Sequence, residues 1–200
     1  HSPYVPHTDL PSFGNKPRDL YDAEVRYTDE WVGKLIDWVL ESGDTSVILS
    51  ADHGECFGEH GHLKHGYELW EELVRVPLMI HVPGTKPKRI KLPRSHLDLA
   101  PTILELMGYP KGEAMRGVSL VSEVDGDEPK PRPVVVDLTR DNLQDRRRAV
   151  IDGRLKLLAT GDDKAFLLFD VEADPHEKHD LVGERDAFKR MKRLYSKLSE

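Results

Sequence analysis

The sequence predicts an α/β protein with a mainly parallel sheet flanked by helices, followed by a small antiparallel sheet with a C-terminal helix. Two observations carry this prediction. In the first part of the chain, helical and strand-like segments alternate, as they do around parallel sheets. After an acidic and then proline-rich stretch at 122–133, short apolar runs joined by turns follow one another, which is typical of an antiparallel meander.

The segments before residue 84 predict the order helix, strand, helix, strand. Apolar residues keep helical spacing over 22–41, so we expect an amphipathic helix there that packs on the sheet. Residues 45–51 form a short, continuous aliphatic and β-branched run, which is typical of a buried central strand. A short helix is expected at 67–73 and a second strand at 76–82. We expect these strands to run parallel to each other.

The next segment, 96–107, carries apolar side chains on one helical face. Gly108 stands where a C-cap glycine would end this helix. Pro101 fits if the helix begins near Asp98, because proline is tolerated in a first turn. Later strands are predicted at 134–136, 149–151, 155–158 and 166–169, and a final helix at 184–198. The change of pattern places a boundary between residues 125 and 126.

Composition limits the possible functions. The chain has 200 residues and a net charge of −7 with both signs spread along it, so a nucleic-acid surface is not expected. Its single cysteine, Cys56, allows neither an intrachain disulfide nor a cysteine-based zinc site. No apolar run reaches the length of a membrane span, and the sequence leaves a cytoplasmic or a secreted location open. The first residue is His1 and not Met, so we treat the chain as a fragment.

Asp52 and His53 are the first candidate site residues, because they directly follow the strand predicted at 45–51. Ligands of open α/β sheets bind outside the carboxyl ends of the strands. Gly54 permits the turn that would let both side chains reach one ion. A carboxylate and an imidazole suit a divalent cation: further carboxylates favour Ca²⁺ or Mg²⁺, and further nitrogen favours Zn²⁺ or Mn²⁺. The alternative is a hydrogen-bonded aspartate at a strand end beside a satisfied histidine.

Three more histidines, His60, His62 and His65, follow in a glycine-containing loop. Such a loop composition is typical of the lining of a site. His60 and His62 fit loop positions better than ligand positions. A zinc site made of these three histidines alone would leave Asp52 and His53 unused, so it is disfavoured.

Several segments together resemble the sulfatases, within the alkaline phosphatase superfamily. The segments that carry the resemblance, in family order, are 51–55, 57–61, 65–66 and 69–78, with further matches at 1–4, 97–102, 116–120, 168–171 and 174–177. The resemblance implies an alkaline phosphatase-like fold. Residues 1–125 would be the C-terminal part of the α/β catalytic core, and residues 126–200 a small antiparallel-sheet subdomain with its terminal helix.

The resemblance also implies roles for individual residues. Asp52 and His53 would complete a divalent-metal site, usually one for Ca²⁺. His1 would contact the ester group. His65, with Lys64 as the competing choice, would contact the sulfate or protonate the leaving oxygen. The implied reaction is hydrolysis of a small-molecule or glycan sulfate ester.

One departure from the family pattern is large. Sulfatases use a formylglycine made within a Cys/Ser-x-Pro-x-Arg motif, and this sequence has no such motif. We therefore expect the formylglycine only in a missing N-terminal segment, and we expect the chain to need that missing N-terminal half as its partner. A phosphodiesterase or phosphonate monoester hydrolase of the same superfamily is one alternative. A noncatalytic metal-binding module is another.

Overall fold

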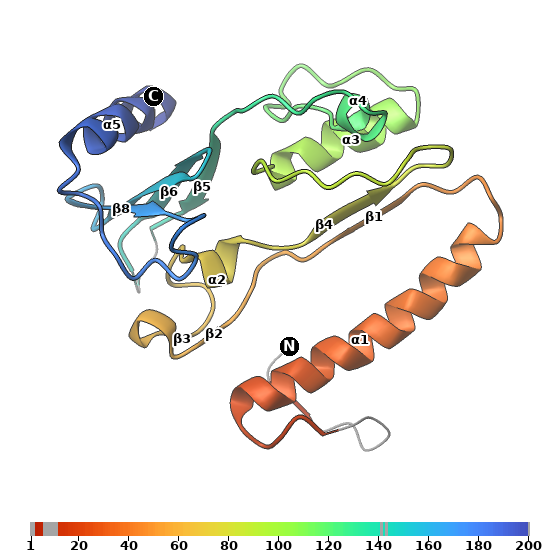
Figure 1. Cartoon of the computed structure of the whole chain (residues 1–200), viewed down its shortest axis with the longest axis horizontal. Helices are drawn as coiled ribbons and strands as arrows, with labels where there is room; N and C mark the ends of the chain where they lie inside the picture. The colour runs from red at the N-terminus through yellow and green to blue at the C-terminus, as the bar shows by residue number, and fades with distance from the viewer. Residues whose placement is uncertain (1–2, 6–11, 141, 143, 200) are drawn as a thin grey trace. The chain divides into compact units, whose positions relative to one another are not determined.

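The computed structural model describes residues 3–5, 12–140, 142 and 144–199 (Figure 1). The chain forms two compact units that interleave in sequence, and each is described by itself. The first unit comprises His1–Ser50, Cys56–Lys64 and Pro77–Gly84, and the second comprises Ala51–Glu55, His65–Val76 and Thr85–Glu200. The boundary between residues 125 and 126 stays a prediction.

The first unit begins with the long helix α1 (Pro17–Leu40). Its start lies five residues before the predicted 22, because Pro17 occupies the first helical turn and Asp19 accepts a hydrogen bond from the Lys16 N–H at 3.0 Å. The predicted helix is confirmed, but its expected packing on a sheet is not. Trp38 is 69% exposed, and Trp31 and Leu35 are also exposed.

The strand pairing in the first unit differs from the expectation of a mainly parallel sheet. β1 (Val47–Ser50) and β4 (Leu78–His81) are antiparallel, with Val47 opposite His81. β2 (Cys56–Phe57) and β3 (Leu63–Lys64) form a second antiparallel pair around the short 3₁₀ turn η1 (Glu59–Gly61). Every strand pair among the described residues is antiparallel. A parallel return usually crosses over through an α-helix that packs on the sheet, whereas the described chain between β1 and β4 holds this hairpin and a four-residue helix.

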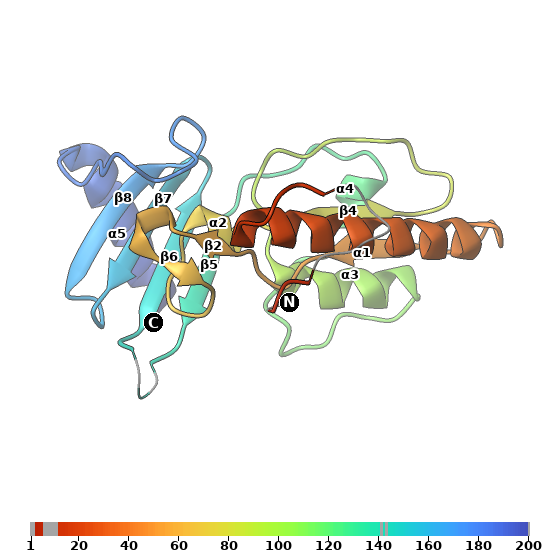
Figure 2. The ribbon, with the colours of Figure 1, turned by 90° about the horizontal axis from the view of Figure 1, so that it is seen from below.

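The second unit contains the predicted meander. Its four strands are β5 (Val134–Leu138), β6 (Arg147–Asp152), β7 (Leu155–Thr160) and β8 (Ala165–Asp170). They form one antiparallel sheet in the order β5-β6-β7-β8 (Figure 2). The sequence prediction of an antiparallel sheet after residue 133 is confirmed.

The helix α5 (Arg185–Ser199) covers one face of this sheet (Figures 1 and 2). Met191 and Tyr195 of α5 pack there against buried aliphatic side chains of the sheet. The opposite face is covered by Leu69 and Trp70, which pack against Phe169 and its neighbours. Successive residues of each strand therefore enter two different cores, because successive side chains of a strand point to opposite faces of the sheet.

The remaining helices of the second unit are α2 (Glu71–Val74), α3 (Leu99–Leu106), which follows the 3₁₀ turn η2 (His96–Asp98), and α4 (Val121–Val124). Gly108 has φ +75°, and its N–H donates to Glu105 O at 3.0 Å, so the predicted glycine cap of α3 is confirmed. Asp98 is fully buried and accepts two hydrogen bonds from Arg132, which gives it a structural role. None of the helices in the described part of the chain has the length and hydropathy that a membrane crossing needs.

Candidate metal and catalytic site

The segment Ala51–Glu55 carries the strongest candidates and lies in the second unit. Gly54 fixes its position, because the Gly54 N–H donates to Leu73 O at 2.8 Å. A Cβ atom at Gly54 would lie 2.0 Å from the carbonyl oxygen of Glu72. Only glycine allows the segment to approach the α2 backbone this closely. The glycine expected to permit a turn is therefore also required by this close approach.

Asp52 and His53 lie side by side. The Asp52 side chain is 89% exposed, and Oδ2 is 3.7 Å from His53 Nε2. The backbone N–H of His53 donates to Asp52 Oδ1 at 3.0 Å, and this bond, helped by the His53 and His65 rings, holds the pKa of the Asp52 carboxyl below its ordinary value. The carboxylate is therefore in the ionised form that a metal ligand requires.

The ring of His53 has a defined orientation. Its Nδ1 lies 2.8 Å from Gly54 O, and because a carbonyl oxygen can only accept, Nδ1 carries the hydrogen. The Nε2 atom, on the Asp52 side, then has the free electron pair. A carbonyl partner on the far ring nitrogen is the usual arrangement of a metal-ligating histidine.

His65 joins this group from the segment that follows β3. Its ring stacks on His53 with the centroids 4.1 Å apart and the planes inclined by 31°. Its Nδ1 lies 3.1 Å and 3.3 Å from the two carboxylate oxygens of Glu55. The structure thus brings together Asp52, His53 and His65, and the roles that the resemblance implies for them stay predictions.

The two other predicted site residues are Lys64 and His1. Lys64 ends β3 in the first unit, has φ +66°, and stands opposite Cys56 in the hairpin. His1 lies outside the described residues. The competition between His65 and Lys64 for one catalytic role therefore stays a prediction, with the carboxylate partner of His65 in its favour.

Asp52 and His53 fit a divalent cation. An ionised oxygen donor and a nitrogen donor 3.7 Å apart can be neighbouring ligands of one ion, given ligand bonds of about 2.3–2.6 Å for Ca²⁺. Two ligands do not complete a coordination shell, since Ca²⁺ takes about six to eight oxygen-rich ligands. This pair can therefore supply part of a shell.

A buried ionic network holds α2 behind the site. Lys156 is fully buried on β7, and its Nζ lies 3.0 Å from a carboxylate oxygen of Glu71 and 3.0 Å from one of Glu177. Burial raises the pKa of the Glu177 carboxyl, and Lys156 offsets part of that effect. The Gly54 N–H donates to the backbone of α2, and the network holds α2 through Glu71. The network therefore helps to position the candidate site.

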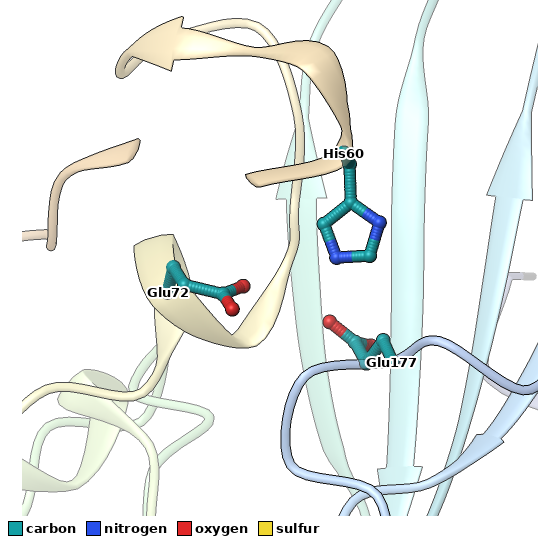
Figure 3. A group of neighbouring side chains, drawn as sticks. All are labelled: His60, Glu72 and Glu177. Atoms are coloured by element: carbon teal, nitrogen blue, oxygen red, sulfur yellow. The ribbon is translucent and has the colours of Figure 1, made fainter. Parts of the chain in front are cut away.

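Figure 3 shows the Glu72 and Glu177 carboxylates directed toward the same space. Their oxygens lie within 4.8 Å of one another. Glu72 also contacts His176 Nδ1 at 2.9 Å. The ammonium group of Lys156 already pairs with the Glu177 carboxylate of this group, so a second cation has less to gain here than beside Asp52. No sequence pattern predicts this pairing, because residues 72 and 177 are far apart in the chain.

Glu55 is a site residue that the sequence patterns did not single out. In the sequence it is only one residue of the matching segment 51–55. Its side chain is 6% exposed and contacts His65, ten residues later in the chain. The sequence hint that could have identified Glu55 is that an acid directly follows Asp52-His53-Gly54. Its contact with His65 depends on the β2–β3 hairpin, which brings residues 55 and 65 together.

Family models match nearly the whole chain. The model described as Sulfatase matches residues 1–109, and the model described as N-sulphoglucosamine sulphohydrolase, C-terminal, matches residues 58–200. Solved structures of sulfatases and of alkaline phosphatase-like enzymes share the fold described above. The chain belongs to the sulfatase family.

Individual relatives agree with this assignment. A choline-sulfatase of Rhizobium meliloti is 36% identical over 84% of this chain and 33% of its own length. An N-acetylglucosamine-6-O-sulfatase of Bacteroides thetaiotaomicron is 26% identical over 90% of this chain and 34% of its own length. A phosphonate monoester hydrolase of Silicibacter pomeroyi shares the fold, with a TM-score of 0.75 and 24% identity over 91% of this chain and 40% of that one. The chain spans about a third of the length of the curated relatives it matches.

Proposed function

We propose that this chain contributes part of the active site of a sulfuric ester hydrolase with a divalent-metal site. The observation that carries the proposal is the convergence of Asp52, His53 and His65 within one unit, in the region that the Sulfatase model matches. Residues 1–125 would belong to the catalytic core, and residues 126–200 would form a subdomain that supports it.

Each residue has a task in this reaction. Asp52 and His53 would hold the cation, with Ca²⁺ favoured over Mg²⁺, Mn²⁺ or Zn²⁺ because the resemblance to the sulfatases implies a calcium site. The bound cation would supply positive charge to the anionic oxygens of the ester. His65 would donate a proton to the leaving oxygen, a contribution of about 10²- to 10⁴-fold. Lys64 is the competing donor, and His1 would contact the ester group.

The remaining groups would come from outside these 200 residues. No Cys/Ser-x-Pro-x-Arg motif occurs in the sequence, so the formylglycine nucleophile of the family would lie in an N-terminal segment of the same protein. The substrate would be a small-molecule or glycan sulfate ester. This proposal is supported by the similarity to a choline-sulfatase and to an N-acetylglucosamine-6-O-sulfatase.

The test is an assay of the full-length gene product that contains this sequence, beside the 200-residue chain. Inorganic sulfate release from 4-nitrophenyl sulfate is measured with and without Ca²⁺. We expect turnover by the full-length product and none by the chain alone. Robust turnover by the chain alone would contradict the proposal that the nucleophile lies elsewhere.

A phosphodiesterase or phosphonate monoester hydrolase is the second candidate. It is favoured by the fold shared with the Silicibacter pomeroyi phosphonate monoester hydrolase. The same assay with 4-nitrophenyl phenylphosphonate and with bis(4-nitrophenyl) phosphate separates the two functions. A kcat/KM at least tenfold higher for either phosphorus ester than for the sulfate would favour this candidate. No turnover of any ester, with Ca²⁺ bound, would favour a noncatalytic metal-binding module.

A further inference from the structure

We propose that Glu55 is the positioning residue of His65: its carboxylate accepts the Nδ1–H hydrogen of the imidazole, so that the protonated ring gives its Nε2–H proton to the leaving oxygen and is left as the Nδ1–H tautomer. This inference rests on the proposed function for the use of His65, but the orientation itself stands on the geometry. Glu55 acts only through His65 and would not touch the substrate.

The contact between the Glu55 and His65 side chains is close and largely shielded from solvent. The Glu55 side chain is 6% exposed, and both of its oxygens lie within 3.3 Å of His65 Nδ1. An ionised carboxylate can only accept, so Nδ1 carries the hydrogen and Nε2 is the remaining ring nitrogen. A carboxylate removed from water needs hydrogen-bond donors to offset its lost hydration, and the imidazole N–H is such a donor.

Two further restraints fix the ring. His53 stacks on one side of it with the centroids 4.1 Å apart. The backbone of Glu55 is anchored through its neighbour Gly54, whose N–H donates to Leu73 O. The imidazole of His65 is therefore held by one polar contact at Nδ1 and one ring contact on its face. A proton donor must be placed within hydrogen-bond reach of the atom it serves, so such restraint has a direct catalytic use.

The pairing matters for chemistry because free imidazole can carry its hydrogen on either nitrogen. Without the carboxylate, Nδ1 loses its acceptor, and the hydrogen is free to move to Nε2. The ring also loses its polar restraint and keeps only its face contact with His53. Glu55 thus selects both the tautomer and the orientation, as carboxylate partners of functional histidines do elsewhere.

The direct test is the tautomer of His65 in the full-length gene product that contains this sequence, labelled with ¹⁵N at histidine and observed by two-bond ¹H–¹⁵N correlation NMR at a pH where the ring is neutral. His65→Gln assigns the signal. We expect the Nδ1–H tautomer in the unsubstituted chain. Finding the Nε2–H tautomer there would overturn the proposal before any substitution of Glu55 is made.

Variants sharpen this result. Glu55→Leu removes the acceptor at similar volume, and we expect the Nε2–H tautomer to become the major form. Glu55→Gln keeps a neutral acceptor, so it should retain more of the Nδ1–H form than Glu55→Leu does. Glu72→Gln is the matched control, because Glu72 makes an equivalent contact with His176 Nδ1 at 2.9 Å. It should leave His65 unchanged, and an equal change in both variants would contradict the proposal.

Activity of the full-length gene product supplies the second readout. We expect Glu55→Leu to lower kcat by about 10- to 100-fold, with KM changed less than threefold. The loss should be at least tenfold larger for aryl sulfates with poor leaving groups than for those with good ones, because only the former need a proton. Equal losses for both would indicate a merely structural role. If the product hydrolyses no ester while His65 is the Nδ1–H tautomer, the proposed function fails and the positioning stands.

Discussion

Lys156 places its ammonium group 3.0 Å from a carboxylate oxygen of Glu177, and both side chains are fully buried. Glu71, the first residue of α2, has a carboxylate oxygen 3.0 Å from the same ammonium group. The network thus links the sheet, the segment after β8 and the helix that underlies the candidate site. The geometry of the candidate site therefore depends on these ion pairs, because they hold the helix that Gly54 contacts.

Removing the charge at the centre of this network should destabilise the chain strongly. We expect Lys156→Ala to lower the free energy of unfolding by about 3–5 kcal/mol, because two buried carboxylates lose their counter-ion. Urea denaturation followed by circular dichroism measures the change. The triple variant Lys156→Met, Glu71→Gln, Glu177→Gln should cost less than Lys156→Ala, since it leaves no buried charge. A loss below about 1 kcal/mol for Lys156→Ala would contradict the structural role.

The same network predicts a dependence of stability on pH. Burial raises the pKa of the Glu177 carboxyl above that of an unfolded glutamate, which is about 4.3. The folded state therefore binds the proton more tightly, and the associated stability is present below about pH 4.3 and is lost as the pH rises through the folded pKa. Glu177→Gln cannot titrate. The free energy of unfolding of Glu177→Gln minus that of the unsubstituted chain should therefore increase as the pH rises above about 4.3, and a constant difference would contradict this prediction.

Gly54 should not tolerate a side chain. A Cβ atom there would lie 2.0 Å from the Glu72 carbonyl oxygen, and both groups belong to backbone that cannot rotate away. We expect Gly54→Ala to lower the free energy of unfolding by about 1–3 kcal/mol and to disturb the NMR signals of His53 and His65.

Gly33 provides the matched control for that substitution. It lies inside α1, and a Cβ atom added there would have nothing within 4 Å. Gly33→Ala should therefore stabilise the chain by about 0.5–1 kcal/mol, the usual gain of alanine over glycine in a helix. If Gly54→Ala were as harmless as Gly33→Ala, the close approach of the two backbones would be wrong.

The exposed apolar face of α1 should promote self-association of the chain. Trp31, Leu35 and Trp38 are more than half exposed and lie three to four residues apart, so they share one helical face. We expect Trp38→Lys to reduce concentration-dependent association in sedimentation velocity experiments. Asp29→Asn makes the same change of net charge on the opposite side of the helix and serves as a control. Association that is unaffected by Trp38→Lys would show that this face is not responsible.

Local sequence patterns predicted the elements well, and the physical reasons are local. The meander after residue 133 follows from alternating apolar runs separated by turn residues such as Gly153 and Gly161, both with positive φ. The end of α3 follows from Gly108, which supplies the left-handed conformation that a helix cap needs. These signals lie within a few residues of the structure they specify.

The pairing of β1 with β4 could not be predicted in the same way. Continuous apolar strands such as 47–50 are common in parallel sheets, but their direction depends on the path of the chain between them. That path contains the β2–β3 hairpin, whose two-residue strands carry almost no periodic signal. The contact between Glu55 and His65 was missed for the same reason, because it depends on this hairpin.

The proximity of Asp52 and His53 was the part of the candidate site that the sequence predicted best. Asp52 and His53 are adjacent, so their proximity follows from covalent connection, and Gly54 marks the special backbone that they need. The buried carboxylates behind the site were not foreseen. Glu71 and Glu177 meet Lys156 from distant positions, and burial of charged groups has no signature in a single sequence.

The most direct test of the central claim is sulfate release by the full-length gene product carrying Asp52→Asn or His53→Ala, with bound Ca²⁺ measured on the same samples. Asp44→Asn, at an exposed position just before β1, is the control. We predict that both site variants lose bound Ca²⁺ and at least about 100-fold in kcat/KM for 4-nitrophenyl sulfate, while the control retains both. Variants that keep their Ca²⁺ and hydrolyse the ester at the unsubstituted rate would contradict the account.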